Sequence, residues 1–195
     1  MNGSNIAGSN SDRGRVEDDY YATNPKAVEM LLDREHFDCV DVLEPSVGGG
    51  NIANVILNRN PNANLTAVDI CDRGYPNTRV EDFLCDFNMY SKYDTIIQNP
   101  PYAEAEKFIW KTLDLLKDGG KMACFLKLQF LESAGREFLF TAFPPKYIYV
   151  FRDRMGVWRN GESKDENGKD WNTTMCFAWF VWYKGCKDEP VVRWL

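Results

Sequence analysis

The sequence predicts an α/β protein whose mostly parallel sheet is covered by helices on both faces. Short apolar runs alternate with amphipathic runs almost without exception between residues 20 and 195, which favours a sheet with crossover helices. A glycine cluster follows the first apolar run, as in open sheets that bind ligands at their carboxyl edge. With 195 residues, 44% of them hydrophobic, the chain has enough apolar surface for a stable core without disulfides.

The first half of the chain predicts three strands and two helices. Residues 1–16, rich in Gly, Ser and Asn, are expected to be a disordered leader, and residues 17–195 a single domain. A helix is expected to begin near Pro25, because Thr23 or Asn24 can cap it and proline suits the first turn. Strands are expected over 39–45, 65–70 and 78–84, with a helix over 52–60.

The second half predicts three further strands separated by helices, and then a final strand. The fourth strand precedes residue 99, and an amphipathic helix over 103–120 is expected to end at Gly119-Gly120. A strand over 121–131, a helix over 133–143 and a strand over 146–154 follow. Residues 156–174 are polar and predict a loop, and residues 176–185 predict a last strand buried on both faces. Because no helix joins the last two strands, they are expected to form an antiparallel hairpin at the sheet edge.

Composition and charge exclude several classes of protein. No apolar run approaches the roughly 18–20 residues of a membrane-spanning helix. The net charge of −6 leaves room only for a local basic patch on an acidic body. The six cysteines form no C-x-x-C pair, so we expect no zinc site and no other metal. His36 is the single histidine and is expected to lie on the surface, and no signal peptide opens the chain, so we expect a cytoplasmic protein.

Two features at strand ends predict a nucleotide-like cofactor. The segment from Glu44 to Gly50 follows the first strand, and its glycines let the backbone pass close to a ligand. It contains neither G-x-G-x-x-G nor a P-loop, so a plain turn remains an alternative. Asp69 ends the second strand, where a carboxylate can accept hydrogen bonds from both ribose hydroxyls, although a solvated acid at a strand end remains open. Together they indicate an adenosine-containing cofactor.

The segment Asn99-Pro100-Pro101-Tyr102 carries the most specific chemistry. Asn99 offers a side-chain carbonyl oxygen, and the rigid Pro100 can direct a backbone carbonyl to the same place. Tyr102 offers a flat face for stacking. Two acceptors beside a stacking platform suit a planar ring that carries an exocyclic amine.

These motifs resemble those of amino-methyltransferases that use S-adenosylmethionine, most closely the N6-adenine DNA methyltransferases with motif X ahead of motif I. NPPY at 99–102 matches the catalytic motif, Glu44 to Gly50 motif I, Asp69 motif II, and Asp82-Phe83 motif III. Tyr20 to Pro25 resembles motif X. The resemblance implies a Rossmann-like class I methyltransferase fold, with a seven-stranded sheet and a C-terminal antiparallel hairpin.

The resemblance also implies which residues form the site. The catalytic residues would be Asn99, Pro100, Pro101 and Tyr102. The residues binding S-adenosylmethionine would be Tyr21, Thr23, Glu44, Pro45, Ser46, Gly48, Gly50, Asp69, Ile70, Asp82, Phe83 and Asn99. Asp86, in a second Asp-Phe pair, is the alternative to Asp82.

The implied reaction is transfer of a methyl group to adenine N6. Hydrogen bonds from the amine to Asn99 and to the Pro100 carbonyl would localise a lone pair that is otherwise delocalised into the ring. A duplex substrate would need its base flipped out and stacked on Tyr102. A second aromatic wall is expected from Phe151, Trp158, Trp171 or Phe177, preferably within 152–174. Arg154, Trp158 and Arg159 are the expected substrate-binding residues.

Little of the sequence remains for a target-recognition domain, and the acidic charge does not favour a free-standing DNA-binding protein. Three explanations fit: a partner subunit supplies target recognition, the enzyme accepts DNA with little sequence preference, or the substrate is not DNA. The resemblance implies a nucleic-acid substrate, DNA first and RNA second. Protein-glutamine methylation remains an alternative. So does a non-catalytic subunit of a larger complex.

Overall fold

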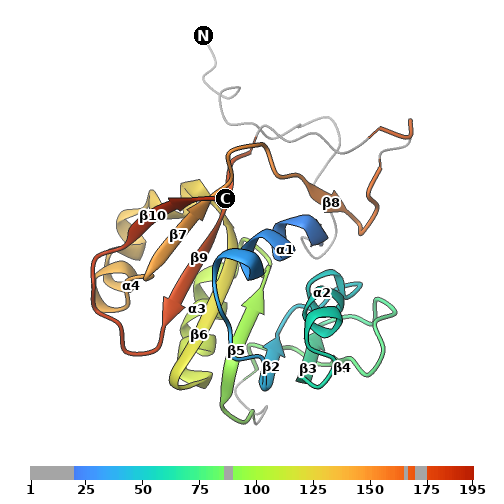
Figure 1. The fold of residues 1–195 in the computed structure, drawn as a ribbon, viewed down its shortest axis with the longest axis horizontal. Helices are drawn as coiled ribbons and strands as arrows, with labels where there is room; N and C mark the ends of the chain where they lie inside the picture. The colour runs from blue at the N-terminus through green and yellow to red at the C-terminus, as the bar shows by residue number, and fades with distance from the viewer. Residues whose placement is uncertain (1–19, 86–89, 165–166, 170–174) are drawn as a thin grey trace.

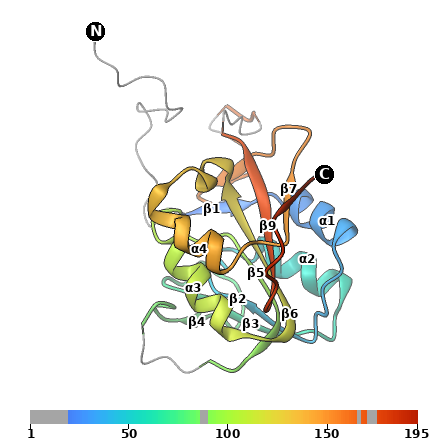
Figure 2. The ribbon, with the colours of Figure 1, turned by 90° about the vertical axis from the view of Figure 1, so that its left-hand side faces the viewer.

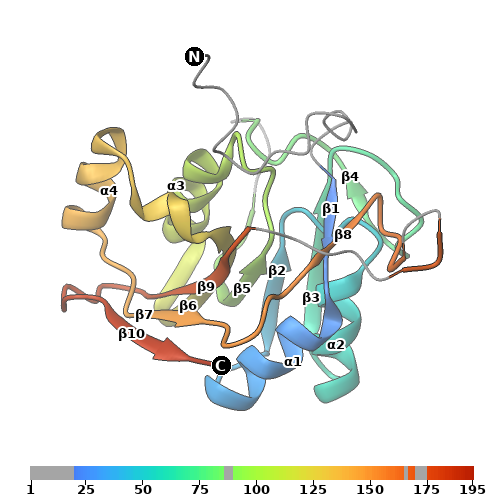
Figure 3. The ribbon, with the colours of Figure 1, turned by 90° about the horizontal axis from the view of Figure 1, so that it is seen from above.

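The computed structural model describes residues 20–85, 90–164, 167–169 and 175–195. The expected leader 1–16, the alternative acid Asp86 and the aromatic candidate Trp171 lie outside these residues. Within the described part, a sheet is covered on one face by helices α1 (Pro25–Arg34) and α2 (Asn51–Arg59), as Figures 1 and 3 show. Helices α3 (Ala105–Leu115) and α4 (Glu137–Ala142) cover the other face (Figure 2).

The main sheet confirms the expected fold class. Among the described residues its order is β10-β7-β9-β6-β5-β2-β3-β4 (Figure 1). Strand β9 runs antiparallel to its neighbours β6 and β7, and every other neighbouring pair is parallel. The bounds are β2 (Asp41–Glu44), β3 (Asn64–Asp69), β4 (Arg79–Val80), β5 (Tyr93–Gln98), β6 (Leu116–Lys127), β7 (Tyr147–Val150), β9 (Phe177–Tyr183) and β10 (Val191–Trp194).

The sheet has one strand more than the seven expected, counted over the described residues. The additional strand is β10, which pairs in parallel with β7 and forms the edge. The antiparallel pair β7–β9 is present as expected, but it lies inside the sheet rather than at its edge.

A small second sheet forms where a loop was expected. Strand β1 (Tyr21–Thr23) pairs antiparallel with β8 (Val157–Arg159), so that Tyr21 faces Arg159 and Thr23 faces Val157 (Figure 3). The expectation of a loop throughout 156–174 is therefore wrong at 157–159. We call these two strands the β1–β8 ribbon.

Helix α1 begins as the sequence predicts. The side chain of Asn24 caps the helix by accepting a hydrogen bond from the Lys26 amide at 3.0 Å, and Pro25 occupies the first helical position. The helix buries Ala27, Val28 and Leu31 against the sheet. This fixes the chain just before it, which is strand β1.

Helix α3 ends earlier than expected. The helix stops at Leu115, and β6 begins at Leu116, which pairs with Tyr93 of β5. Gly119 and Gly120 therefore lie within the strand, at a register shift against β5, and do not cap the helix. A Cβ at Gly120 would approach the Lys117 carbonyl oxygen to 2.9 Å, so the bulge requires glycine there. Strand β6 ends at Lys127, and two short 3₁₀ turns, Leu128–Leu131 and Ala134–Arg136, lead to α4.

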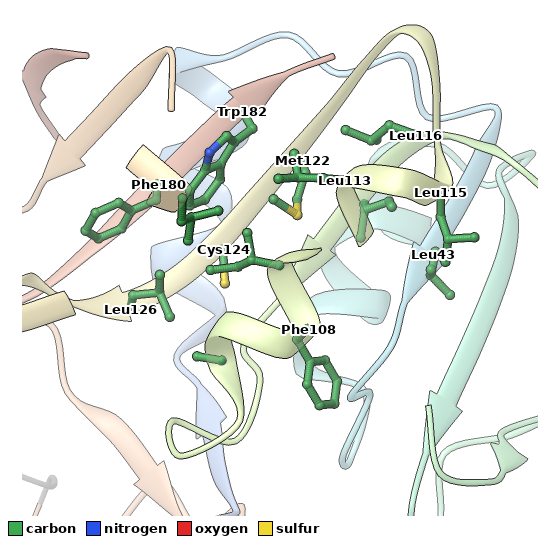
Figure 4. Packing of buried hydrophobic residues seen from close by; sticks show 14 of the residues in the cluster. Leu43, Phe108, Leu113, Leu115, Leu116, Met122, Cys124, Leu126, Phe180 and Trp182 are labelled. Carbon is green, nitrogen blue, oxygen red and sulfur yellow. The ribbon is translucent and has the colours of Figure 1, made fainter. Parts of the chain in front are cut away.

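Alternation along β6 and β9 divides the hydrophobic core into two layers. Met122, Cys124 and Leu126 face α3 together with Phe180 and Trp182, and Figure 4 shows part of this cluster. Ala123, Phe125, Phe177, Trp179 and Val181 face α1 and α2. Strand β9 is thus buried on both faces, as the sequence predicts. Outside this core, His36 is exposed, as expected, and contacts Asp38.

None of the helices that the structure describes is long and apolar enough to cross a membrane.

Candidate functional site

A cavity of about 550 Å³ opens at the carboxyl ends of β2, β3 and β5. Parallel strands bring their carboxyl ends to one edge, which is where open α/β sheets bind ligands. Strand β1, the loop after β4 and the first turn of α3 complete the wall. The sequence-predicted residues that line it are Tyr21, Thr23, Glu44, Pro45, Ser46, Asp69, Ile70, Asp82, Phe83, Asn99 and Pro101.

Seven of the sequence-predicted residues do not line this cavity: Gly48, Gly50, Pro100, Tyr102, Arg154, Trp158 and Arg159. Pro100 is buried. Sequence reasoning missed several residues that do line it, namely Tyr20, Asn51, Arg73, Glu104 and Lys107. Asn51 follows the glycines directly, which is a signal that could have identified it. Nothing local in the sequence marks Arg73.

The glycines shape the loop after β2 by allowing two tyrosines to pack on it. Gly48 has φ +54°, and a Cβ there would lie 2.5 Å from the ring of Tyr20. Gly50 has φ +85°, and a Cβ there would lie 2.0 Å from the ring of Tyr75. A side chain at either position would strain the backbone and displace a tyrosine ring. The Tyr20 hydroxyl also accepts a hydrogen bond from the Gly49 amide at 3.0 Å.

Glu44 is a buried carboxylate at the floor of the cavity. It is 1% exposed, and its Oε2 accepts no hydrogen bond from the described residues. Burial raises the pKa of Glu44 well above its ordinary value, the Ala53 amide opposes this shift by hydrogen bonding, and the charge of Asp69 adds to it. Such a group gains most from a cation placed at Oε2.

Asp69 is held by the loop that it faces. Its Oδ2 accepts a hydrogen bond from the Gly48 amide at 2.8 Å, and its Oδ1 accepts one from the Cys71 amide at 3.1 Å. The Nε atom of Arg73 lies 3.6 Å from Oδ1, and the Arg73 guanidinium lies 4.2 Å from the centre of the Tyr20 ring. The carboxylate is therefore fixed at the end of β3, where its remaining lone pairs can accept from a ligand.

Asp82 and Phe83, the pair preferred for motif III, both line the cavity. The Phe83 ring is buried and packs at 5.1 Å from Phe108 and 5.2 Å from Tyr90, measured between ring centres. Asp82 is exposed, and its Oδ1 accepts a hydrogen bond from the Leu84 amide at 2.9 Å. An apolar wall beside an acceptor is the pattern that an aminated aromatic ring requires.

Asn99 is fixed in one orientation by two neighbouring segments. Its Nδ2 donates to the carbonyl oxygen of Tyr21 at 2.7 Å, and the Ser46 hydroxyl donates to its backbone carbonyl at 3.1 Å. Because a carbonyl oxygen can only accept, the contact with Tyr21 requires the Nδ2 on that side and directs Oδ1 away from it. Oδ1 is buried and accepts no hydrogen bond from the described residues.

Tyr102 stands beside the cavity in an aromatic cluster. Its ring centre lies 6.2 Å from that of Tyr21, at an interplanar angle of 21°, and 6.0 Å from that of Phe177. Phe177 and Phe151, two candidates for a second aromatic wall, are buried in the core. Trp158 is half-buried in β8 opposite Ala22, a residue that lines the cavity. Arg159 follows it in β8, and Arg154 is exposed just before that strand.

The fold is also found among known structures at low sequence identity. A Listeria monocytogenes protein assigned to the class I S-adenosylmethionine-dependent methyltransferases matches with a TM-score of 0.57 at 14% identity, over 88% of this chain and 62% of that one. The modification subunit of a Vibrio vulnificus enzyme assigned to the type I restriction enzymes matches with a TM-score of 0.60 at 13% identity, over 90% and 47%. The chain has the fold of the class I S-adenosylmethionine-dependent methyltransferases.

The M protein of the type I restriction enzyme EcoKI matches similarly, with a TM-score of 0.59 at 12% identity, over 86% of this chain and 44% of that one. The chain thus spans about half the length of the two restriction-enzyme proteins and less than two thirds of the Listeria protein. No protein-family model and no curated protein sequence matches it.

S-adenosylmethionine is the cofactor expected for this fold, and the cavity fits it chemically. Two buried oxygens at its wall, Glu44 Oε2 and Thr23 Oγ1, are without a hydrogen-bond partner among the described residues. A ligand that carries an ammonium group, hydroxyls and an amino-substituted ring offers donors to such acceptors. No cluster of three or more metal-ligating side chains occurs in the described ranges.

Proposed function

We propose that the protein is an S-adenosylmethionine-dependent methyltransferase acting on an exocyclic amine, with adenine N6 in DNA as its acceptor. The observation that carries this proposal is Asn99: its side-chain amide is held by the Tyr21 carbonyl, its backbone carbonyl accepts from the Ser46 hydroxyl, and its buried Oδ1 has no partner among the described residues. A locked, unpartnered acceptor is what an N–H donor on a substrate requires.

Each part of the cavity has a role in this proposal. Bound S-adenosylmethionine supplies an electrophilic methyl group on a sulfonium sulfur. Glu44 and Thr23 would hold its amino-acid end, Asp69 its ribose hydroxyls, and Asp82 and Phe83 its adenine. Tyr21, Pro45, Ser46 and Ile70 would complete the binding surface, and Gly48 and Gly50 would shape the loop.

On the acceptor side, the chain would polarise the amine by hydrogen bonding. Asn99 Oδ1 and the Pro100 carbonyl would each accept one N–H, which localises the nitrogen lone pair and directs it at the cavity. Pro101 lines the cavity between these groups and Tyr102. Tyr102, Trp158, Arg154 and Arg159 would contact the substrate, with the aromatic side chains on its base and the arginines on its phosphates.

DNA is favoured as the substrate, with RNA second, because two of the similar structures belong to type I restriction enzymes. A partner subunit that contributes target recognition belongs to the same proposal. The net charge of −6 supports it, because an acidic chain lacks the broad positive field that attracts DNA by itself.

The test is transfer of labelled methyl from S-adenosylmethionine to duplex DNA, single-stranded DNA, total RNA and a release-factor protein. Asn99→Ala is expected to reduce turnover by roughly 10²–10³-fold, the cost of one positioned donor–acceptor contact, while cofactor binding is retained. Asn60→Ala is the matched control, because the Asn60 Nδ2 also donates to a backbone carbonyl, that of Cys39, but far from the cavity.

Label recovered as N6-methyladenine in DNA supports the proposal. Label found only in RNA or protein contradicts DNA as the acceptor and assigns the methyl transfer to the labelled molecule instead. Cofactor binding without labelling of any acceptor contradicts methyl transfer by this chain alone and makes the partner subunit a requirement. Equal losses of turnover in Asn99→Ala and Asn60→Ala contradict a catalytic role for Asn99.

A further inference from the structure

Lys127 ends β6 at the cavity edge of the sheet. Alternation along the strand puts it on the same face as Ala123 and Phe125, which are buried in the cluster that faces α1. One step beyond that cluster, the Lys127 ammonium lies 4.8 Å from the centre of the Tyr102 ring. The residue is half-buried, so its charge is only partly hydrated.

The Lys127 ammonium lacks a carboxylate partner among the described residues. The other two lysines of β6, also partly buried, have one: Lys117 lies 2.5 Å from Asp41, and Lys121 lies 2.7 Å from Glu35. The Lys127 ammonium instead lies over the face of the Tyr102 ring. A partly desolvated ammonium whose partner among the described residues is an aromatic face favours binding of an external anion.

The position of Lys127 relates this charge to the acceptor side of the site. Strands β5 and β6 are parallel neighbours, with Gln98 beside Cys124, so the segment from Asn99 and the end of β6 emerge at the same edge. Tyr102 contacts Tyr21, whose carbonyl orients Asn99, and it also contacts Lys127. The hydrogen-bond acceptor of Asn99, the ring of Tyr102 and the ammonium of Lys127 thus lie at the same edge of the sheet.

We infer that Lys127 binds a backbone phosphate of the nucleotide whose base stacks at Tyr102. This inference rests on the proposed function and narrows its substrate class. A nucleotide carries a planar amine-bearing ring and an anion within one residue, whereas a glutamine side chain carries neither the ring nor the charge. Lys127 is therefore a specificity-determining residue that favours nucleic acid over protein acceptors.

The test measures binding of a labelled single-stranded thymidine tract with one central adenine, across a series of salt concentrations, to the full chain. Each phosphate contact contributes about 0.7 to the slope of log K against log salt for single strands. Lys127→Met, which keeps an unbranched apolar stem, is expected to lower the slope by about 0.7. Lys127→Arg is expected to retain the wild-type slope.

Lys187→Met is the matched control. The Lys187 ammonium also lies over an aromatic ring, that of Phe143 at 4.4 Å, but on the face formed by α4. Its removal changes the net charge equally and is expected to leave the slope unchanged. Cofactor binding by each variant, measured by calorimetry, verifies that the fold is intact.

A second arm replaces single phosphates of the same oligonucleotide by neutral methylphosphonates. The wild type is expected to lose affinity when one phosphate next to the adenine is replaced, and Lys127→Met to be insensitive at that position. An unchanged slope in Lys127→Met, equal effects of the Lys127 and Lys187 changes, or no binding of the oligonucleotide by the wild type overturns the inference.

Methyl transfer to the same oligonucleotide separates this inference from the proposed function. A wild type that methylates the adenine, together with an unchanged slope in Lys127→Met, contradicts the role of Lys127 and leaves the function standing. A wild type that binds with the Lys127-dependent slope but transfers no methyl supports Lys127 and contradicts the function.

Discussion

At the scale of single residues, the site depends on buried oxygens that accept no hydrogen bond from the part of the chain that the structure describes. Buried polar groups are nearly always hydrogen-bonded, because an unpaired one costs about 1–3 kcal/mol. Glu44, Thr23 and Asn99 share this deficiency around one cavity. A bound ligand that donates hydrogen bonds to these groups accounts for their arrangement, whereas packing alone does not.

Glu44 gives a prediction about pH. Because the pKa of Glu44 is raised in the folded chain, mainly by burial, the folded state holds a proton that the unfolded state releases. The free energy of unfolding should therefore fall as pH rises from the ordinary carboxyl pKa through the raised one. Glu44→Gln is expected to remove this decline, and urea unfolding at a series of pH values measures it.

The same proton makes cofactor binding sensitive to pH. An ammonium group at Oε2 favours the carboxylate, so cofactor affinity should increase as pH rises through the raised pKa of Glu44. Calorimetry in two buffers of different ionisation enthalpy should detect proton release on binding. The idea fails if the wild type and Glu44→Gln release the same number of protons.

At the scale of elements, the loop before α2, which contains Gly50, can be compared with the loop after β3, which contains Gly74. Gly50 and Gly74 both have φ +85°, but a Cβ at Gly50 would lie 2.0 Å from the Tyr75 ring, whereas one at Gly74 meets nothing within 4 Å. Gly74→Ala should cost about 1–2 kcal/mol through backbone strain alone. Gly50→Ala should cost more and should also weaken cofactor binding, as thermal unfolding and calorimetry would measure. Equal effects would exclude the clash.

The elements of the main sheet could be predicted because their signals are local. Apolar runs that end in an acid placed Glu44 and Asp69 at strand ends, and Asn24-Pro25 marked the start of α1. Helix α3 was predicted too long, since Gly119-Gly120 resembles a helix C-cap. Pairing of Leu116 with Tyr93 of β5, a tertiary contact, draws the chain into β6 instead.

The β1–β8 ribbon could not be predicted for a related reason. Its strands have three residues each, which is too few for a periodic pattern. They form because the two segments, distant in sequence, pair with each other. The positions of Tyr20 and Arg73 in the cavity wall depend on this pairing and on the loop after β3. NPPY and the strand-end acids were recognisable from sequence order alone, whereas the contacts that orient Asn99 required the fold.

At the scale of the whole molecule, a buried ionic cluster joins α1 to the far half of the sheet. Glu35 is 6% exposed and accepts hydrogen bonds from Lys121 of β6 at 2.7 Å, Tyr149 of β7 at 2.8 Å and Tyr183 of β9 at 2.5 Å. Burial raises the pKa of Glu35, but these hydrogen bonds outweigh burial and lower it overall.

Removing this carboxylate should destabilise the entire fold. Glu35→Ala leaves Lys121 without its carboxylate and two tyrosine hydroxyls without the acceptor they share, and is expected to lower the free energy of unfolding by about 3–5 kcal/mol. Because the folded pKa is lowered, the wild-type stabilisation should be present above the ordinary carboxyl pKa and lost as pH falls through the lowered one.

Urea unfolding at a series of pH values measures both effects. Glu29→Ala, an exposed acid on the same helix, is the control and should change stability by no more than about 0.5 kcal/mol. A Glu35 variant as stable as the control would show that the cluster contributes nothing net.

The β1–β8 ribbon also bears on how the chain folds. Tyr21 and Arg159 meet only after a loop of roughly 140 residues has closed, at an entropic cost that rises with the logarithm of loop length. Neighbouring strands such as β2 and β3 close a far shorter loop. The parallel sheet can therefore assemble before the ribbon does. On a ribosome, the wall that orients Asn99 cannot be completed until Arg159 has been synthesised, so cofactor binding would stabilise the finished fold rather than nucleate it.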